Sequence, residues 1–224
     1  MRSGILRQAS VSIAALIIAT VALGFGYPLA LTGISQLFFH NQANGSLIYA
    51  NGKLVGSALL GQSFTDPKGN PLPQYFQPRP SDAGTGYDGT SSGASNLGPS
   101  NPVLINEVSE RARAYRAFNH MASNAVVPVD AVTASGSGLD PDISIQNALD
   151  QAPRIAQARH LSLAQVLTLL HHHTTPAEWD FLSEPVVNVL QLNLALDHFF
   201  PDHPGKSDLT SERQEKSSRV DGLR

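Results

Sequence analysis

The chain has 224 residues, 42% of them hydrophobic, which suffices for one sizeable folded domain beside a membrane segment but is short for two such domains. Its formal net charge of -3 at pH 7 excludes the strongly basic field that draws proteins to nucleic acid, so no nucleic-acid partner is expected. Because the chain contains no cysteine, it has no disulfide, no thiolate metal site and no cysteine nucleophile.

The N-terminal part of the chain contains one long apolar segment. No Asp, Glu, Lys or Arg occurs from Gln8 through Gly52, and residues 9–37 form an almost continuous apolar run. A spanning helix needs only about 20 such residues, so 9–37 is predicted to be a transmembrane helix. A cleaved signal peptide is the alternative, since Gly24 and Gly26 have the spacing of a cleavage site, but the run continues too far beyond them to favour it.

The charges that flank this helix predict its orientation. Arg2, Arg7 and the amino terminus lie on one side, whereas the first cation on the other side is Lys53. By the positive-inside rule, residues 1–8 are expected to be a short cytoplasmic end. The rest of the chain, after about residue 37, is then expected outside the cytoplasm.

One face of the predicted helix carries small residues at spacings of three or four. Small residues let helix backbones approach closely, and lipid gives helices no hydrophobic reason to associate. This face is therefore predicted to contact partner helices, the alternative being that alanine is simply common in such helices. Pro28 is expected to kink the outer half of the helix. The predicted contact residues are Ala15, Ala19, Ala22, Gly26, Ala30 and Gly33.

Residues 38–200 are predicted to form one extracytoplasmic α+β (or α/β) domain. Within it, residues 38–60 contain β-favouring stretches broken by glycines and suit one or two short strands. Residues 61–102 are dense in Gly, Pro, Ser and Asn, which predicts a long loop of a length that is usually functional. The charged tail, 201–224, has few apolar residues and is predicted to be disordered.

Two further elements are expected directly after the loop. Asn101 is a suitable cap and Pro102 a suitable first residue for a helix, and apolar residues keep helical spacing over 103–121. The β-branched run 126–132 is predicted to be a buried strand. It leads into a glycine-rich turn at 135–138.

The last part of the domain is predicted to be mainly helical. Asp140 is interpreted as the cap of a helix over 143–159, in which Pro153 must mark the start, a kink or the end. A Ser-x-x-Gln capping box at 162–165 predicts the start of the next helix. For 186–196, periodicity does not separate a buried strand from a helix packed on two sides.

Several residues could carry chemistry, and a structural interpretation is favoured for each. The three histidines at 171–173 would point in different directions on a helix and cannot converge on one ion, so no metal site is predicted. The glycines within 84–89 have dinucleotide spacing but follow no strand. Arg154 and Arg159 could bind an anion or could simply face acids and solvent, and the solvent-exposed interpretation is favoured.

A hydrolase is kept as an alternative function. Ser135 and Ser137 lie among glycines and, with an Asp or His partner, could serve a membrane-tethered extracytoplasmic enzyme that uses a serine of the turn 135–138. The G-x-S-x-G pattern of such nucleophiles is absent, so a structural turn is favoured and no catalytic residue is assigned.

Two long motifs resemble a known family. Residues 95–102, Ser-Asn-Leu-Gly-Pro-Ser-Asn-Pro, and 133–141, Thr-Ala-Ser-Gly-Ser-Gly-Leu-Asp-Pro, resemble motifs of the C subunits of Kdp potassium-transporting P-type ATPases. With shorter matches elsewhere, the resemblance covers about residues 5–199. It implies a single-pass protein of the bacterial plasma (inner) membrane.

The resemblance also implies a function for the chain. It would be a non-catalytic accessory subunit of a high-affinity, ATP-driven potassium uptake complex, required for assembly with a channel-like potassium-binding subunit and a P-type ATP-hydrolysing subunit. A small membrane subunit is a further implied partner. The family is credited with raising the ATP-binding affinity of the catalytic subunit, so ATP and potassium are expected to be handled by the complex, with no cofactor assigned to this chain. Direct ATP binding conflicts with the predicted orientation, because ATP is cytoplasmic.

The matched motifs contain polar side chains that are candidates for partner contact or for structural roles. They lie in the long loop, in the turn at 135–138 and near it, and in the helical region that follows. These candidates are Arg79, Ser95, Asn96, Asn101, Ser137, Asp140, Arg154 and Asn188.

Overall fold

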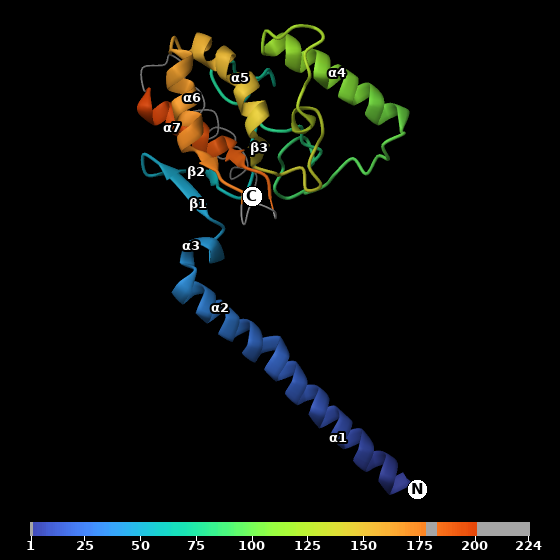
Figure 1. Ribbon diagram of the computed structural model, residues 1–224. Coiled ribbons are helices and arrows are strands. Elements are labelled where there is room, and N and C mark those ends of the chain that lie inside the picture. Colours follow the sequence, from blue (N-terminus) through green and yellow to red (C-terminus); the bar gives the residue numbers. More distant parts are fainter. Residues whose placement is uncertain (1, 178–182, 201–224) are drawn as a thin grey trace.

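The computed structural model describes residues 2–177 and 183–200, which form a long helix with a folded body at one end (Figure 1). The helix consists of α1 (Arg2–Val21), a π-helical turn η1 (Ala22–Gly26) and α2 (Tyr27–Phe38). From Gly4 to Phe38 it is long and apolar enough to cross a membrane, and none of it is buried against the body. In the described part of the chain it is the one helix with these properties, which confirms a long apolar N-terminal helix of the kind predicted.

The hydrogen-bond pattern of this helix changes just before Pro28. The amide of Tyr27 donates to the carbonyl of Ala22, five residues back, which is the pattern of a π-helical turn. In a regular α-helix the ring of Pro28 would clash with the carbonyl four residues back, and the widened turn lies where that clash would fall. The expected interruption at Pro28 is therefore a widened turn, and the helix continues through it (Figure 1).

A short helix and a β-hairpin join the membrane helix to the body. They are α3 (His40–Ala43), β1 (Leu47–Ala50) and β2 (Lys53–Ser57), and the two strands pair antiparallel. Asn51 and Gly52 connect the strands, both with positive φ, as the favoured two-residue hairpin turn requires. The short strands predicted within 38–60 are confirmed.

The body combines helices with a small antiparallel sheet, which confirms the predicted α+β class. Its elements are α4 (Pro102–Phe118), the 3-10 turn η2 (Val129–Ala131), β3 (Asp142–Ser144), α5 (Ile145–Ala158), α6 (Leu163–His172), β4 (Thr174–Thr175), β5 (Val186–Asn188) and α7 (Val189–Phe199). The strand order is β3-β5-β4. The predicted tail, 201–224, lies outside the described residues.

One hydrophobic core lies between α5, α6 and α7. Ile155, Val166 and Leu192 are completely buried in it, and so is Phe76, which comes from the long loop rather than from a helix or strand. The loop is therefore part of the core although it forms no regular element between Ser57 and Pro102 apart from one isolated bridge. The buried members of the core come from the body and none from the membrane helix.

Several local predictions are confirmed. Asn101 caps α4, its Oδ1 accepting from the amide of Val103 at 2.9 Å, and the capping box of Ser162 and Gln165 starts α6. The segment 186–196, left open between strand and helix, contains both, because β5 passes directly into α7.

The strand predicted at 126–132 is wrong. Only Val129–Ala131 within the segment form a regular element, the 3-10 turn η2, and Val126 is 88% exposed. Arginines of α4 hold the segment, with Arg116 Nε donating to the carbonyl of Ala125 at 2.8 Å. A β-branched run becomes a strand only where another strand can pair with it, and here the neighbour is a helix.

The predicted role of Asp140 as a helix cap is also wrong. A short strand, β3, comes first, and Ser144 caps α5, its Oγ accepting from the amide of Asn147 at 3.1 Å. Pro153 lies inside α5 rather than at either end. The acceptor that fixes the helix start is therefore the serine four residues after Asp140.

A chain that lacks residues 1–37 is expected to fold as a soluble body, because the deleted part contributes nothing to the core. Circular dichroism should show the helices of the body, and urea should unfold it in one cooperative transition. Phe76→Ala in this fragment should cost about 3–5 kcal/mol. A fragment without a cooperative transition would contradict the independence of the body.

Candidate functional site

Buried polar side chains hold the first part of the long loop against α5 and α7. The amide of Phe76 donates to Oδ1 of Asn193 and its carbonyl accepts from Nδ2, both at 2.9 Å. Gln151 makes the same pair of bonds to Gln77, at 2.7 and 3.1 Å. The two side-chain amides thus take the place of a neighbouring β-strand and satisfy the backbone of a buried segment.

Arg154, which is 3% exposed, binds the same segment from α5. Its Nη1 donates to the carbonyls of Pro73 and Tyr75, the latter at 3.1 Å, and its Nε and Nη2 donate to Asn119 and Gln151 at 2.9 Å. Burial lowers the pKa of Arg154 to about 10, so it remains a cation at neutral pH. The solvent-facing role predicted for Arg154 is wrong.

Arg159 is also buried, so its predicted solvent-facing role is wrong as well. Its Nε donates to the carbonyl of Gln74 at 2.7 Å, and its Nη2 pairs with Asp197 at 2.9 Å. The hydroxyl of Tyr75 donates to the same carboxylate at 3.1 Å. Burial, followed by the charge of Asp197, raises the pKa of Tyr75 to about 12, which keeps this hydroxyl protonated as a donor.

The polar contacts continue from α5 to α4 and to η2. Oδ1 of Asn147 accepts from the hydroxyl of Tyr115 at 2.8 Å and from Nε2 of Gln151 at 2.9 Å. Nδ2 of Asn147 donates to Asp130 at 3.0 Å. Burial, with smaller effects from nearby carboxylates, raises the pKa of Tyr115. One network of hydrogen bonds therefore connects the first part of the long loop to α5 and α4.

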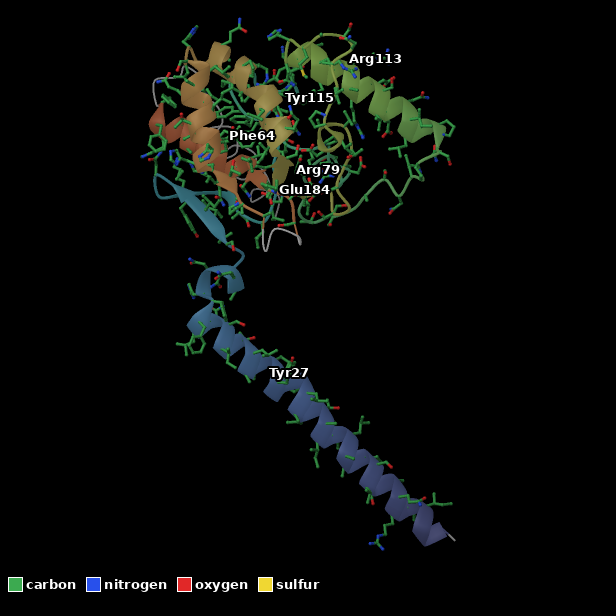
Figure 2. The ribbon with its side chains drawn as sticks, in the orientation of Figure 1. Tyr27, Phe64, Arg79, Arg113, Tyr115 and Glu184 are labelled. Carbon is green, nitrogen blue, oxygen red and sulfur yellow. The ribbon has the colours of Figure 1, made fainter. Side chains whose placement is uncertain are left out.

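The turn at 135–138 with Asp140 forms a second anchor for the loop. Ser81 Oγ donates to the carbonyl of Gly138 at 2.6 Å, and the amide of Gly93 donates to that of Ser137 at 3.0 Å. Arg79 and Asp140 form an ion pair of 2.8 Å at the same place, and Arg79 lies within the body in Figure 2. Loop residues 79–93 are thereby fixed to the second matched motif.

Asp140 has a local role besides the ion pair. Its Oδ1 accepts from the amide of Asp142 at 3.0 Å, and burial together with the charge of Asp140 raises the pKa of Asp142. The hydroxyl of Tyr87 donates to the carbonyl of Arg79, which holds the arginine backbone beside this pair. The carboxylate of Asp140 therefore orders the turn and the loop together.

The hydroxyls of the two serines serve the turn. Ser137 Oγ accepts from the amide of Leu139 at 3.1 Å, and Ser135 Oγ lies 3.4 Å from the amide of Asp140. The two hydroxyl oxygens are 3.5 Å apart. Since both are used within the turn, the hydrolase alternative is not supported.

The other polar candidates lie outside these two anchors. Ser95 and Asn96 are exposed in the loop, where Asn96 has a φ of 54°. Asn101 caps α4. Asn188 caps α7 and also donates to the carbonyl of Ala58 at 2.9 Å, which joins α7 to the chain after the hairpin. Partner contact through any of these residues stays a prediction.

The small residues of the membrane helix are all exposed, but the π-helical turn divides them. Such a turn adds one residue to the helix, and one residue corresponds to a rotation of about 100°. Ala30 and Gly33 are therefore rotated by about that angle relative to Ala15 and Ala19, so the predicted single face becomes two shorter faces. Their contact with partner helices stays a prediction.

The three histidines lie at the C-terminal end of α6, as predicted. His171 and His172 are in its last turn, and His173 follows the helix. Burial, with a smaller effect of His172, lowers the pKa of His173. In the residues that the structure describes, no three His, Asp or Glu side chains are grouped to hold a metal ion.

The side-chain amides that fix the loop were not predicted from the sequence. Gln151 and Asn193 are polar positions in otherwise buried stretches of α5 and α7. A polar residue at a core position must find a partner, so the isolated Asn193 between Leu192 and Leu194 was the available signal. Its partner, a loop backbone distant in the chain, could not be read from local pattern.

In the part of the chain that the structure describes, one apolar helix of spanning length is joined to one α+β body, which fits the class of single-pass membrane proteins. A family model described as "KdpC: K+-transporting ATPase, c chain" matches residues 9–198. The match includes both the membrane helix and the body. The chain belongs to this KdpC family.

Several relatives are named "Potassium-transporting ATPase KdpC subunit". The Mycobacterium tuberculosis protein is 53% identical over 191 residues, which are 85% of this chain and 98% of the relative. That of Acidobacterium capsulatum is 52% identical over 181 residues, 81% and 92% of the two chains. That of Rhodospirillum rubrum is 50% identical over 196 residues, 88% and 96% of the two chains.

Removing the amide of Asn193 should destabilise the body strongly. Asn193→Ala leaves the buried amide and carbonyl of Phe76 without these partners, at a cost of about 2–5 kcal/mol. Gln191→Ala, on the exposed side of the same helix, is the matched control and should change stability by less than about 0.5 kcal/mol. Urea unfolding of the soluble body measures the stability of both variants. Equal losses would contradict the role of Asn193 in holding the loop.

The turn can be tested with two glycines in one segment. Gly138 has a φ of +67°, and an added Cβ would lie 2.7 Å from backbone atoms of Ala83 and Gly93. Gly138→Ala should therefore cost at least about 2 kcal/mol. Gly136→Ala, where a Cβ meets nothing within 4 Å, should leave the unfolding midpoint nearly unchanged. A tolerated Gly138→Ala would show that loop and turn are not tightly joined.

Proposed function

We propose that this chain is a non-catalytic accessory subunit of a high-affinity, ATP-driven potassium uptake complex, required for its assembly with the potassium-binding and ATP-hydrolysing subunits. The main support is the family match, which runs from residue 9 in the membrane helix to residue 198 at the end of the body. The relatives are named as subunits of a potassium-transporting ATPase, which supports this ATPase as the complex that the chain joins.

The orientation proposed for the chain has the N-terminus in the cytoplasm of a bacterium and the body outside. Arg2 and Arg7 flank the helix on one side, while the other flank is uncharged up to Lys53, which supports this orientation by the positive-inside rule. The body then stands at the outer face of the inner membrane, on the side from which potassium enters.

The internal contacts of the body support a structural role for it. Arg154 and Arg159 are cations suited to binding an anion, but all their donors except Nη1 of Arg159 are directed to loop carbonyls and to the side chains of Asn119, Gln151 and Asp197. ATP and potassium would accordingly be handled by the other subunits. In the proposed orientation, an effect on the ATP affinity of the catalytic subunit would pass through contacts of the membrane helix.

Pull-down from detergent-solubilised membranes tests this function. The tagged full chain should bring down a P-type ATPase subunit and a potassium-binding subunit, and cells with it should take up potassium at low external concentration. Deletion of residues 1–37 should abolish both results while leaving the body folded. Val126→Ala, on the exposed surface of the body, should leave both intact. An intact, transporting complex after the deletion would refute the assembly role of the helix.

A further inference from the structure

A cleft of about 340 Å³ lies between the end of α4 and one side of α5, where Figure 1 shows the C-terminal end of α4 beside α5. Residues 119–121 form one wall and residues of α5 between 149 and 157 form the other. Pockets that take small molecules have volumes of about 300–1,000 Å³. The cleft is therefore large enough for a small organic molecule.

Pro153 gives this cleft a backbone acceptor. In an α-helix the carbonyl of Leu149 points towards residue 153 and accepts from its amide, but Pro153, which lies inside α5, has no N–H to donate. The proline ring also crowds this carbonyl and tilts it away from the helix. Since Leu149 and Pro153 both line the cleft, the carbonyl of Leu149 is available to a ligand there.

Asp150 supplies a carboxylate to the same cleft. Its Oδ1 accepts from Nε2 of Gln146 at 2.7 Å, and none of the ion pairs between described residues includes it. Burial raises the pKa of Asp150, the hydrogen bond from Gln146 lowers it, and the charge of Asp130 raises it. A bound cation would stabilise the ionised form of this carboxyl group.

The charges around the cleft favour a cation over an anion. Besides burial, the charges of Asp150 and Asp130 raise the pKa of Tyr115, and the charge of Arg154 lowers it, so all three charged groups lie around this side chain. Two carboxylates and one guanidinium leave one negative charge in excess. Arg154 is 3% exposed, and its nitrogens donate to loop carbonyls and to two side-chain amides, so it offers an anion little.

The remaining walls of the cleft are apolar. Met121 and the ring of Pro153 line it, and so does Leu149, which is 39% exposed. A bare metal ion would need about six oxygen ligands and would leave these walls unused. An ammonium group has three donors and no acceptor, and a hydrocarbon chain attached to it would cover the apolar walls.

We propose that this cleft is a binding site for a primary alkylammonium group. The N–H groups of the ligand donate to the carboxylate of Asp150 and to the carbonyl of Leu149, and its hydrocarbon chain lies along Met121 and Pro153. Such a group is present in a free aliphatic amine and in the side chain of a lysine on another protein. The site is independent of the role proposed for the chain in potassium uptake.

The methionine content of the chain allows a direct test. The chain has two methionines, Met1 and Met121, and Met121 lines the cleft. The full chain, with ¹³C-labelled methionine methyl groups, is purified in a nonionic detergent and titrated with 1,4-diaminobutane. The methyl signal of Met121 should shift until it reaches saturation, while that of Met1 should stay unchanged.

Two variants test the two acceptors separately. Asp150→Asn should weaken binding by at least about tenfold, because a hydrogen bond between two charged groups is lost. Pro153→Ala restores an amide donor for the carbonyl of Leu149 and should weaken binding by about two- to tenfold. Glu110→Gln removes an exposed carboxylate of α4 and is the matched control, which should leave the affinity unchanged.

A second titration distinguishes the two sources of the amine. Nα-acetyl-lysine amide presents the lysine side chain as a protein would. If it binds more tightly than 1,4-diaminobutane, the ligand is a lysine of another protein, and if it binds more weakly, the ligand is a free amine. Both results would support the site.

Four results would overturn the proposal. They are an unshifted Met121 signal at saturating amine, an equal shift with 1-butanol and with 1-aminobutane, an equal shift with potassium chloride, and unchanged affinity in Asp150→Asn or Pro153→Ala. The second would show an apolar crevice that does not recognise charge, and the third a site for a bare cation. None of them bears on assembly or transport, so the proposed function would stand in each case.

Discussion

The hydrogen bonds between the Asn193 side chain and the backbone of Phe76 are the constraint on which the body depends. Phe76 fills the centre of the core from a segment that belongs to no strand, and a buried peptide group without partners is costly. Asn193 of α7 supplies those partners, Gln151 of α5 does the same for Gln77, and Arg154 binds the carbonyl of Tyr75 beside them. With the loop fixed there, its later part reaches the turn at 135–138.

Elements whose signals are local could be predicted from the sequence. The membrane helix follows from an uninterrupted apolar run, and the starts of α4 and α6 follow from Asn101 and Ser162 as caps. The segment 126–132 was misassigned because β-propensity reports how well a residue suits a pleated surface, and the neighbour that decides the outcome is α4. The sequence does not show which element lies beside which.

In the candidate site, too, local features could be predicted from the sequence and contacts between distant residues could not. The turn around Ser137 was predicted as a turn, but Asp140 was interpreted as a helix cap, because an Asp before a proline has the same local appearance as a cap. The buried state of Arg154 was not predicted, since arginine is rarely buried without partners and its partners are carbonyls of residues about 80 positions earlier in the chain. Several motif residues that carry the family resemblance thus have contacts within the chain itself.

The hydrogen bonds that hold the loop also have a consequence for how the protein is made. The bond between Phe76 and Asn193 joins residues separated by 117 positions, so the loop cannot take its place until α7, near the end of the chain, has been synthesised. Contacts between residues this distant in sequence form late in folding, after the entropy of closing the intervening chain has been lost. Because the membrane helix is made first, the nascent body is already tethered at the bilayer while its core is still incomplete.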